Sequence, residues 1–314
     1  MTRTIAVMSA LIRPLIEPRL PDWVEARYFA NKAEALELAP EAEIGWFDMY
    51  DQANMLPVIH AATRLKWLNS IFAGVDGLPL DLLRDRGVMF TNGAGINAIT
   101  IAEYVVMGML SMAKGYREVV RAQDRHEWLE RPPGRAELAG SRALLLGYGA
   151  IGQRIDRLLA AFEVDVVKVR RGPGEGTLTP DAWRARLGEF DWVILAVPAT
   201  PATEHMIGAA ELAAMKSSAI IVNIARGSVI DQDALVEALQ HKTIGGAFLD
   251  VTTPEPLPAG HPLWSLPDAH VTMHLSGQSQ DKMFQRGADR FLANLAAWRR
   301  GDPVAPQVDL ARGY

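Results

Sequence analysis

The stretch Gly147-Tyr148-Gly149-Ala150-Ile151-Gly152 constrains the fold more than any other part of the chain. The apolar run at residues 143–146 comes just before it and is typical of a buried strand. Apolar residues at helical spacing follow it, namely Ile151, Ile155, Leu158, Leu159 and Phe162. A strand, the pattern G-x-G-x-x-G and a helix, in this order, predict a turn that binds a dinucleotide.

The three glycines of this stretch have separate physical roles. Gly147 permits the tight turn, Gly149 lets a pyrophosphate approach the backbone, and Gly152 lets the helix pack close to the sheet. The start of the helix then offers free N–H groups and a partial positive charge to the phosphates. A glycine-rich turn without a ligand is the alternative interpretation, and the flanking strand and helix favour binding.

Length and composition narrow the class of protein. The 314 residues suggest about two domains, and a net charge of −5 gives no electrostatic case for nucleic acid or an anionic membrane. The chain has no cysteine, which excludes thiolate nucleophiles and cysteine metal sites, and we expect no metal. The longest apolar stretch, residues 99–113, contains Glu103 and falls short of the ~20 residues that span a bilayer. We therefore expect a cytoplasmic enzyme.

Apolar runs of strand length alternate with helical patterns in two parts of the chain. This alternation predicts an α/β fold with two doubly wound parallel sheets. One unit is residues 96–279, with the glycine-rich turn; the other is residues 1–95 joined by 280–314, whose last helix returns to it. A cofactor and a small substrate would meet in a cleft between such units. The predicted strands are 4–8, 44–47, 67–72, 88–91, 143–146, 164–169, 192–197, 219–224, 246–251 and 271–273.

The segment 97–140 separates the two alternating patterns. Residues 97–114 form a predicted helix that is apolar on nearly all sides, which indicates burial in a core or against a partner chain. Residues 116–138 are charged and contain the sequence Arg-Pro-Pro-Gly-Arg at 131–135. We interpret them as a helix followed by an arm, with a solvated connector as the alternative.

The end of the second strand of the dinucleotide unit indicates which cofactor binds. An acidic residue at this place bonds the adenosine ribose and marks NAD. Here Arg170 and Arg171 occupy it, whereas Asp165 comes too early and Glu175 too late. Because guanidinium groups form bidentate bonds to phosphate, the pair predicts NADP, with NAD less favoured. The alternative is a solvated strand end, with cofactor choice made by loop residues.

Three polar residues downstream follow predicted strands. Arg226 lies in Asn-Ile-Ala-Arg-Gly, Glu255 in a proline-rich loop, and His274 just past the last strand. Ligands of open α/β sheets bind outside the carboxyl ends of the strands, so the three lie on the expected side. Taken singly, each has an ordinary alternative as a surface arginine, a solvated glutamate or an unremarkable histidine.

Together these segments resemble the D-isomer-specific 2-hydroxyacid dehydrogenase family, and the paired arginines resemble its glyoxylate/hydroxypyruvate reductase branch. The resemblance implies a Rossmann cofactor domain, a flavodoxin-like substrate domain, and Arg226, Glu255 and His274 as the catalytic triad. It also implies a homodimer formed through region 97–140. The matching segments are 72–76, 91–93, 147–152, 215–227, 248–257 and 261–274.

The residue types suit the reduction of a small 2-keto acid such as glyoxylate or hydroxypyruvate. Arg226 can hold the carboxylate and polarise the carbonyl. Protonated His274 can donate a proton to the carbonyl oxygen as hydride arrives, and Glu255 can orient the imidazole and raise its pKa. The backbone N–H groups of Gly74, Val75 and Asp76 are expected to complete the carboxylate site. By resemblance we expect the remaining cofactor contacts from Val197, Pro198, Ile224, Ala225, Asp250 and His274.

One position departs from the family pattern. Met273 stands where the family usually has a proline before the catalytic histidine, which puts the local pocket shape in question. Candidates for the substrate side-chain pocket, for most of which ordinary packing is the alternative, are Trp46, Phe47, Met49, Tyr50, Met273 and Leu275.

Two other functions stay open at this point. A dinucleotide-sensing binding protein, like the transcriptional corepressors that resemble this family, could keep all three polar residues. The lack of basic tails argues against it. A formate dehydrogenase-like enzyme would carry glutamine in place of Glu255, which argues against that alternative.

Overall fold

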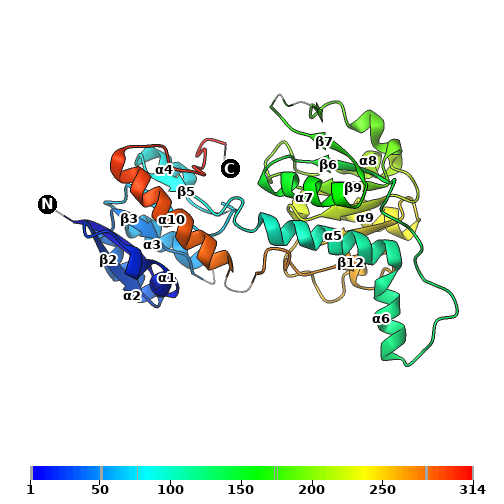
Figure 1. The fold of residues 1–314 in the computed structure, drawn as a ribbon, viewed down its shortest axis with the longest axis horizontal. Coiled ribbons are helices and arrows are strands. Elements are labelled where there is room, and N and C mark those ends of the chain that lie inside the picture. The colour runs from blue at the N-terminus through cyan, green and yellow to red at the C-terminus, as the bar shows by residue number, and fades with distance from the viewer. Residues whose placement is uncertain are drawn as a thin grey trace. The chain divides into compact units, whose positions relative to one another are not determined.

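The computed structural model describes residues 3–49, 52–75, 77–172, 174, 176–279 and 282–312. The chain forms two compact units (Figure 1). Unit 1 is residues 1–97 together with 279–314, and unit 2 is residues 98–278.

Unit 1 is built on a five-stranded sheet in which all neighbouring strands run parallel. The strand order is β2-β1-β3-β4-β5, which is the order of flavodoxin-like folds. The predicted parallel sheet is therefore confirmed. The strands are β1 (Thr4–Ser9), β2 (Val24–Phe29), β3 (Ile44–Trp46), β4 (Trp67–Asn69) and β5 (Met89–Thr91).

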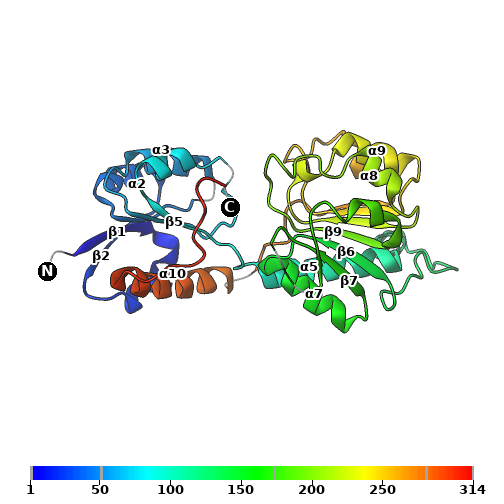
Figure 2. The same ribbon diagram turned by 90° about the horizontal axis from the view of Figure 1, so that it is seen from above.

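Helices cover both faces of this sheet (Figure 2). One core packs under α2 (Lys32–Leu38), α3 (Met55–Ala61) and α4 (Leu80–Asp85). The other packs under α1 (Arg13–Ile16) and α10 (Lys282–Arg300). In that second core the Phe291 ring lies 5.0 Å from Trp46 and 5.2 Å from Trp67, centroid to centroid. The last helix thus returns to the first unit.

Unit 2 has a seven-stranded parallel sheet in the order β12-β11-β10-β9-β6-β7-β8. The direction of strand progression reverses between β6 and β9, and such a switch point is where open α/β sheets bind ligands. The strands are β6 (Arg142–Leu146), β7 (Asp165–Val169), β8 (Thr177–Leu178), β9 (Trp192–Leu195), β10 (Ile220–Asn223), β11 (Gly246–Leu249) and β12 (Ala269–Val271).

Two layers of helices enclose this second sheet. Figure 2 shows α5 (Ala98–Lys114) and α7 (Ala150–Ala161) on one face, with α8 (Ala209–Ala214) and α9 (Gln232–Gln240) on the other. The predicted helix in the charged segment is α6 (Tyr116–Asp124), and residues 125–141 after it contain no helix or strand. Among the described residues, no helix is both long and apolar enough to cross a membrane.

Candidate active site

The glycine-rich turn joins β6 to α7, and its three glycines differ in their surroundings. Gly147 has φ +101°, and a side chain there would collide with the carbonyl oxygen of Ala196. A side chain at Gly152 would collide with the carbonyl oxygen of Gly147. Gly149, in contrast, has nothing within 4 Å of the place a Cβ would occupy. Two glycines are therefore required by backbone packing, while the third faces open space that suits an approaching pyrophosphate.

The start of α7 is suited to an anion. Gly149 is its N-cap and supplies no side-chain hydrogen bond, so the first-turn N–H groups can meet phosphate oxygens. Beside the turn, the Tyr148 hydroxyl donates to Asp156 Oδ2 at 2.6 Å. Lys168 Nζ lies 3.1 Å from the same oxygen. Asp156 thus ties the middle of the glycine turn to α7 and β7, and its hydrogen bond raises the pKa of Tyr148.

The two arginines expected to choose the cofactor follow β7, and both are exposed. The Arg170 amide donates to the carbonyl of Leu178 at 3.2 Å, which fixes the backbone at the strand end. Its side chain lies against the loop at Gly172 and Gly174. Arg170 is also close enough to Tyr148 to lower that residue's pKa by its charge. The structure therefore places a guanidinium beside the glycine turn.

Arg226 follows β10, where side chains and backbone fix its position. The Asn223 side chain donates to the carbonyl of Arg226 at 2.9 Å and accepts from the amide of Ala225 at 3.0 Å. A side chain at Gly227 would collide with the carbonyl of Thr252, so this segment lies directly against the loop that carries Glu255. Arg226 itself is partly buried, and its Nη1 donates to the carbonyl of Ala225 at 2.8 Å.

Glu255 and His274 lie 19 residues apart in the sequence, and the fold brings their side chains into contact. His274 Nδ1 lies 2.8 Å from Glu255 Oε2, and the two side chains are 49% and 38% exposed. The other carboxylate oxygen accepts from the amide of Thr252 at 3.1 Å. The carboxylate is thus held from both sides, and the imidazole is held through Nδ1.

The loop that carries His274 has an unusual backbone. Met273 and His274 have φ values of +56° and +58°, in the left-handed region that non-glycine residues seldom adopt. A proline, with φ fixed near −65°, could not stand at 273 in this conformation. The methionine that departs from the family pattern therefore stands where the backbone conformation excludes proline.

Asp250 braces this same loop. Its carboxylate is 2% exposed and accepts from Thr272 Oγ1 at 2.8 Å and from the amide of Leu275 at 2.9 Å. The amide of Ser276 lies 3.2 Å from both carboxylate oxygens, and the amide of His274 donates to the Asp250 carbonyl at 2.6 Å. In this structure Asp250 holds the histidine loop, a role that sequence reasoning missed. Its expected contact with the nicotinamide carboxamide stays a prediction.

The other predicted cofactor residues also follow strands of this sheet. Val197 and Pro198 follow β9; Val197 is half-buried and Pro198 is exposed. Ile224 and Ala225 follow β10 and are each 6% exposed. Sequence reasoning also missed Gln232, whose amide group contacts Thr253 through two hydrogen bonds, 2.5 Å and 2.9 Å, and so supports the glutamate loop.

In unit 1 the predictions have mixed outcomes. Gly74 and Val75 are half-buried in the loop after β4, and Met49 is half-buried against the core. The structure corrects the expectation for Trp46 and Phe47, whose side chains pack in the core with 1% and 0% exposure and offer no surface to a substrate. Asp76 and Tyr50 lie outside the described residues. In unit 2, Met273 and Leu275 are 63% and 44% exposed.

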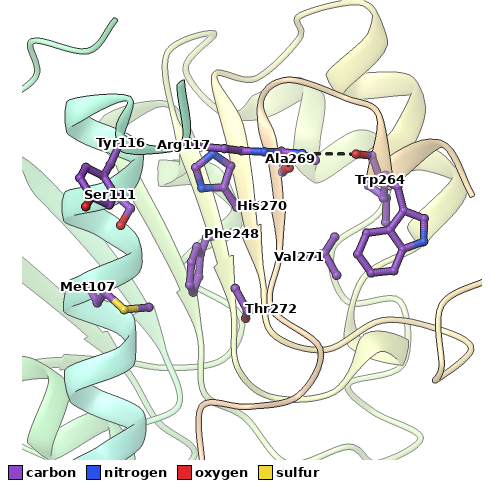
Figure 3. Close-up of a pocket in the computed structure, with 11 residues that line it drawn as sticks. Met107, Ser111, Tyr116, Arg117, Phe248, Trp264, Ala269, His270, Val271 and Thr272 are labelled. Carbon is purple, nitrogen blue, oxygen red and sulfur yellow. Dashed lines mark hydrogen bonds between the residues drawn. The ribbon is translucent and has the colours of Figure 1, made fainter. Parts of the chain in front are cut away.

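A pocket of about 300 Å³ lies in unit 2 beside α5 and β12 (Figure 3). Arg117 extends along it and donates to the carbonyls of Trp264, Leu266 and Ala269. Burial, together with nearby Arg117 and Arg121, lowers the pKa of His270 in its wall to about 4. None of the three predicted catalytic residues lines it. The described residues also contain no group of three His, Asp or Glu side chains that could hold a metal ion.

Comparison with known proteins agrees with this fold. Residues 106–276 match the family model for the NAD binding domain of the D-isomer specific 2-hydroxyacid dehydrogenases. A glyoxylate/hydroxypyruvate reductase B of Yersinia enterocolitica is 31% identical over 292 residues, 88% of each chain.

Solved structures share the whole fold. A D-isomer specific 2-hydroxyacid dehydrogenase family protein from Aeromonas salmonicida superposes with a TM-score of 0.86 at 30% identity, over 99% of this chain and 100% of that one. An NADPH-dependent glyoxylate/hydroxypyruvate reductase from Sinorhizobium meliloti, solved in complex with NADP and malonate, superposes with a TM-score of 0.78 at 25% identity. The match covers 100% of this chain and 98% of that one.

The fold and the glycine turn define a two-unit oxidoreductase with a Rossmann NAD-binding domain. The chain belongs to the D-isomer specific 2-hydroxyacid dehydrogenase family, in its glyoxylate/hydroxypyruvate reductase-like branch. It is thus an NAD(P)-dependent 2-hydroxyacid dehydrogenase.

Proposed function

We propose that this enzyme uses NADPH to reduce a small 2-keto acid, glyoxylate or hydroxypyruvate, to the corresponding 2-hydroxy acid, which is the D isomer wherever C2 of the product is chiral, as it is for hydroxypyruvate. The observation that carries the proposal is the His274–Glu255 pair, 2.8 Å apart and half-exposed at the carboxyl end of the unit 2 sheet. An imidazole held through Nδ1 by a carboxylate has its other nitrogen available for proton transfer.

In this proposal Arg226, His274 and Glu255 each have a separate role in the reduction. Arg226 binds the substrate carboxylate and draws electron density from the carbonyl. His274, protonated, transfers a proton from Nε2 to the carbonyl oxygen while C2 accepts hydride. Glu255 stabilises the imidazolium before the transfer and keeps the ring in place afterwards. When bound, the nicotinamide supplies the hydride, and the product is a hydroxyl group on C2.

The residues present fit a dinucleotide. The open space at Gly149 and the uncapped start of α7 suit the pyrophosphate. The exposed Arg170 and Arg171 after β7 suit a 2′-phosphate, which favours NADP over NAD. The NADP complex of the Sinorhizobium relative supports this preference.

We also propose a homodimer formed through region 97–140. This region presents large apolar side chains to solvent, and Trp128 is 95% exposed, Tyr116 57% and Met107 45%. Several large apolar side chains exposed within one region favour a protein contact there. Sedimentation of the parent chain and of a Trp128→Glu variant tests this. We expect a parent dimer that the variant weakens, and a monomeric parent would contradict it.

Steady-state kinetics on a panel of 2-keto acids, with NADPH and NADH in parallel, test the proposed function. We expect turnover of glyoxylate and hydroxypyruvate, with NADPH preferred. A chain that reduces no member of the panel with either cofactor would overturn the proposal.

A further inference from the structure

A buried carboxylate lies at the end of β3 in unit 1, outside the residues assigned to the reaction. Asp48 is 8% exposed and accepts three short hydrogen bonds. Its Oδ2 accepts from Trp46 Nε1 at 2.6 Å and from the amide of Ile71 at 2.5 Å. Its Oδ1 accepts from Ser70 Oγ at 2.7 Å. Two of the three donors therefore belong to the segment that follows the neighbouring strand, β4.

These bonds continue along the backbone of that segment. Ser70 Oγ accepts from the amide of Phe72 at 3.1 Å, so Asp48 fixes residues 70–72 directly and through the serine. From the other side, the amide of Gly93 donates to the carbonyl of Phe72 at 2.8 Å, and the Asn92 side chain donates to the carbonyl of Ala73 at 2.7 Å. The segment is thus held between Asp48 and the chain after β5. Gly74 and Val75 come next.

This arrangement has a free-energy cost. Burial raises the pKa of the Asp48 carboxyl to about 6, and the opposing influences are the three hydrogen bonds alone. On α10, Arg286 and Arg290 donate to the carbonyls of Ile96 and Ala94. A buried carboxylate without a cation destabilises a fold, and such groups concentrate at functional sites.

We propose that Asp48 is a positioning residue. It fixes the backbone of residues 70–72 so that the N–H groups of Gly74 and Val75 are held in place to bind the carboxylate of the substrate. The inference rests on the proposed function, because it names the carboxylate of a 2-keto acid as the ligand of this loop.

Three variants separate positioning from simple stability. Asp48→Ala removes all three bonds. Asp48→Asn can keep them, because its Oδ1 can accept from Trp46 and Ile71 while its Nδ2 donates to Ser70 Oγ. Thr91→Val is the matched control in the same unit. Thr91 is fully buried, and its hydroxyl accepts from Trp67 Nε1 at 2.8 Å and donates to Asn69 Oδ1 at 2.9 Å. That network makes no bond to residues 71–75 through its side chains.

Kinetics and hydrogen exchange are measured on each full-length variant. We expect Asp48→Ala to raise the KM for the keto acid roughly tenfold, equal to about 1.4 kcal/mol of binding, with kcat changed little and the NADPH dissociation constant unchanged. Asp48→Asn should restore a KM near the parent's, and Thr91→Val should leave the KM unchanged. In hydrogen exchange followed by mass spectrometry, only Asp48→Ala should lose protection at residues 70–75.

The outcomes distinguish the two proposals. If Asp48→Ala leaves the protection of residues 70–75 unchanged, or if Thr91→Val raises KM equally, the positioning role is overturned. If exchange changes as expected but the parent reduces no 2-keto acid, the anchoring stands and the proposed function fails.

Discussion

The carboxyl ends of the two sheets carry polar residues in different ways. In unit 2, His274 and Glu255 are half-exposed; Glu255 is held by an amide of its own loop, and His274 by Glu255 and the carbonyl of Asp250 in that same loop. In unit 1, the carboxylate of Asp48 is buried and turned toward the backbone of a neighbouring loop. Unit 2 thus exposes polar side chains at the end of its sheet, whereas in unit 1 a buried carboxylate fixes the backbone of a neighbouring loop. Substitution of His274 in unit 2 should therefore act on kcat, and substitution of Asp48 in unit 1 on the KM for the keto acid.

The largest effect is expected at His274. His274→Ala removes the proposed proton donor, and general acid catalysis contributes roughly 10²- to 10⁴-fold to a rate, so kcat should fall by that factor. NADPH binding, measured by fluorescence titration, should stay near the parent value because the glycine turn is untouched. A variant that keeps the parent's kcat would remove His274 from the mechanism and leave unit 2 without its expected chemical role.

The buried carboxylate predicts a dependence of stability on pH. Its pKa is raised from 3.8 to about 6 on folding, so the folded chain holds this proton over a range where the unfolded chain has lost it. The stabilisation is complete below pH 3.8 and is lost as pH rises through 6. Asparagine does not titrate. As pH rises from ~4.5 to ~7.5, the free energy of unfolding of Asp48→Asn should therefore increase by about 2 kcal/mol relative to that of the parent.

Urea unfolding of both chains at a series of pH values measures this difference. Thr91→Val serves as the control, since it leaves Asp48 in place and should follow the pH dependence of the parent. If the free energies of unfolding of Asp48→Asn and the parent differ by the same amount at every pH, Asp48 is not a buried titrating group.

A smaller effect is expected at the end of β7. The double change Arg170→Asp with Arg171→Ala removes the proposed charge-assisted bonds to a 2′-phosphate, each worth about 1.5–3 kcal/mol. The kcat/KM for NADPH should then fall roughly 10- to 100-fold, while the value for NADH stays level or rises. The KM for the keto acid should not change, because this loop is proposed to bind the dinucleotide and not the keto acid. An unchanged NADPH/NADH ratio would show that other residues choose the cofactor.

The sequence was most informative where function depends on local pattern. The glycine turn, the parallel strands of unit 2 and the placement of polar residues after apolar runs all follow from short stretches of sequence. The 2.8 Å contact between His274 and Glu255 depends on tertiary folding, and the family resemblance supplied that expectation.

The sequence was least informative where distant contacts decide the structure. No strand is predicted between residues 8 and 44, yet β2 lies there. The strand β2 carries Glu25 and Arg27 and lies at the sheet edge, where pairing with β1 decides its conformation. Trp46 and Phe47 were assigned to a substrate pocket because of their position, and the return of α10 buries Trp46. Asp48 gave no signal, since two of its three donors, Ser70 and Ile71, lie 22 and 23 residues along the chain.

The most direct test of the central claim is the chirality of the product. The purified chain is incubated with hydroxypyruvate and NADPH. Chiral chromatography then measures each enantiomer of glycerate, and absorbance measures the NADPH oxidised in the same sample. The account predicts D-glycerate in equal amount to the NADPH oxidised, and almost none from His274→Ala. L-glycerate, or no glycerate from the parent chain, would contradict it.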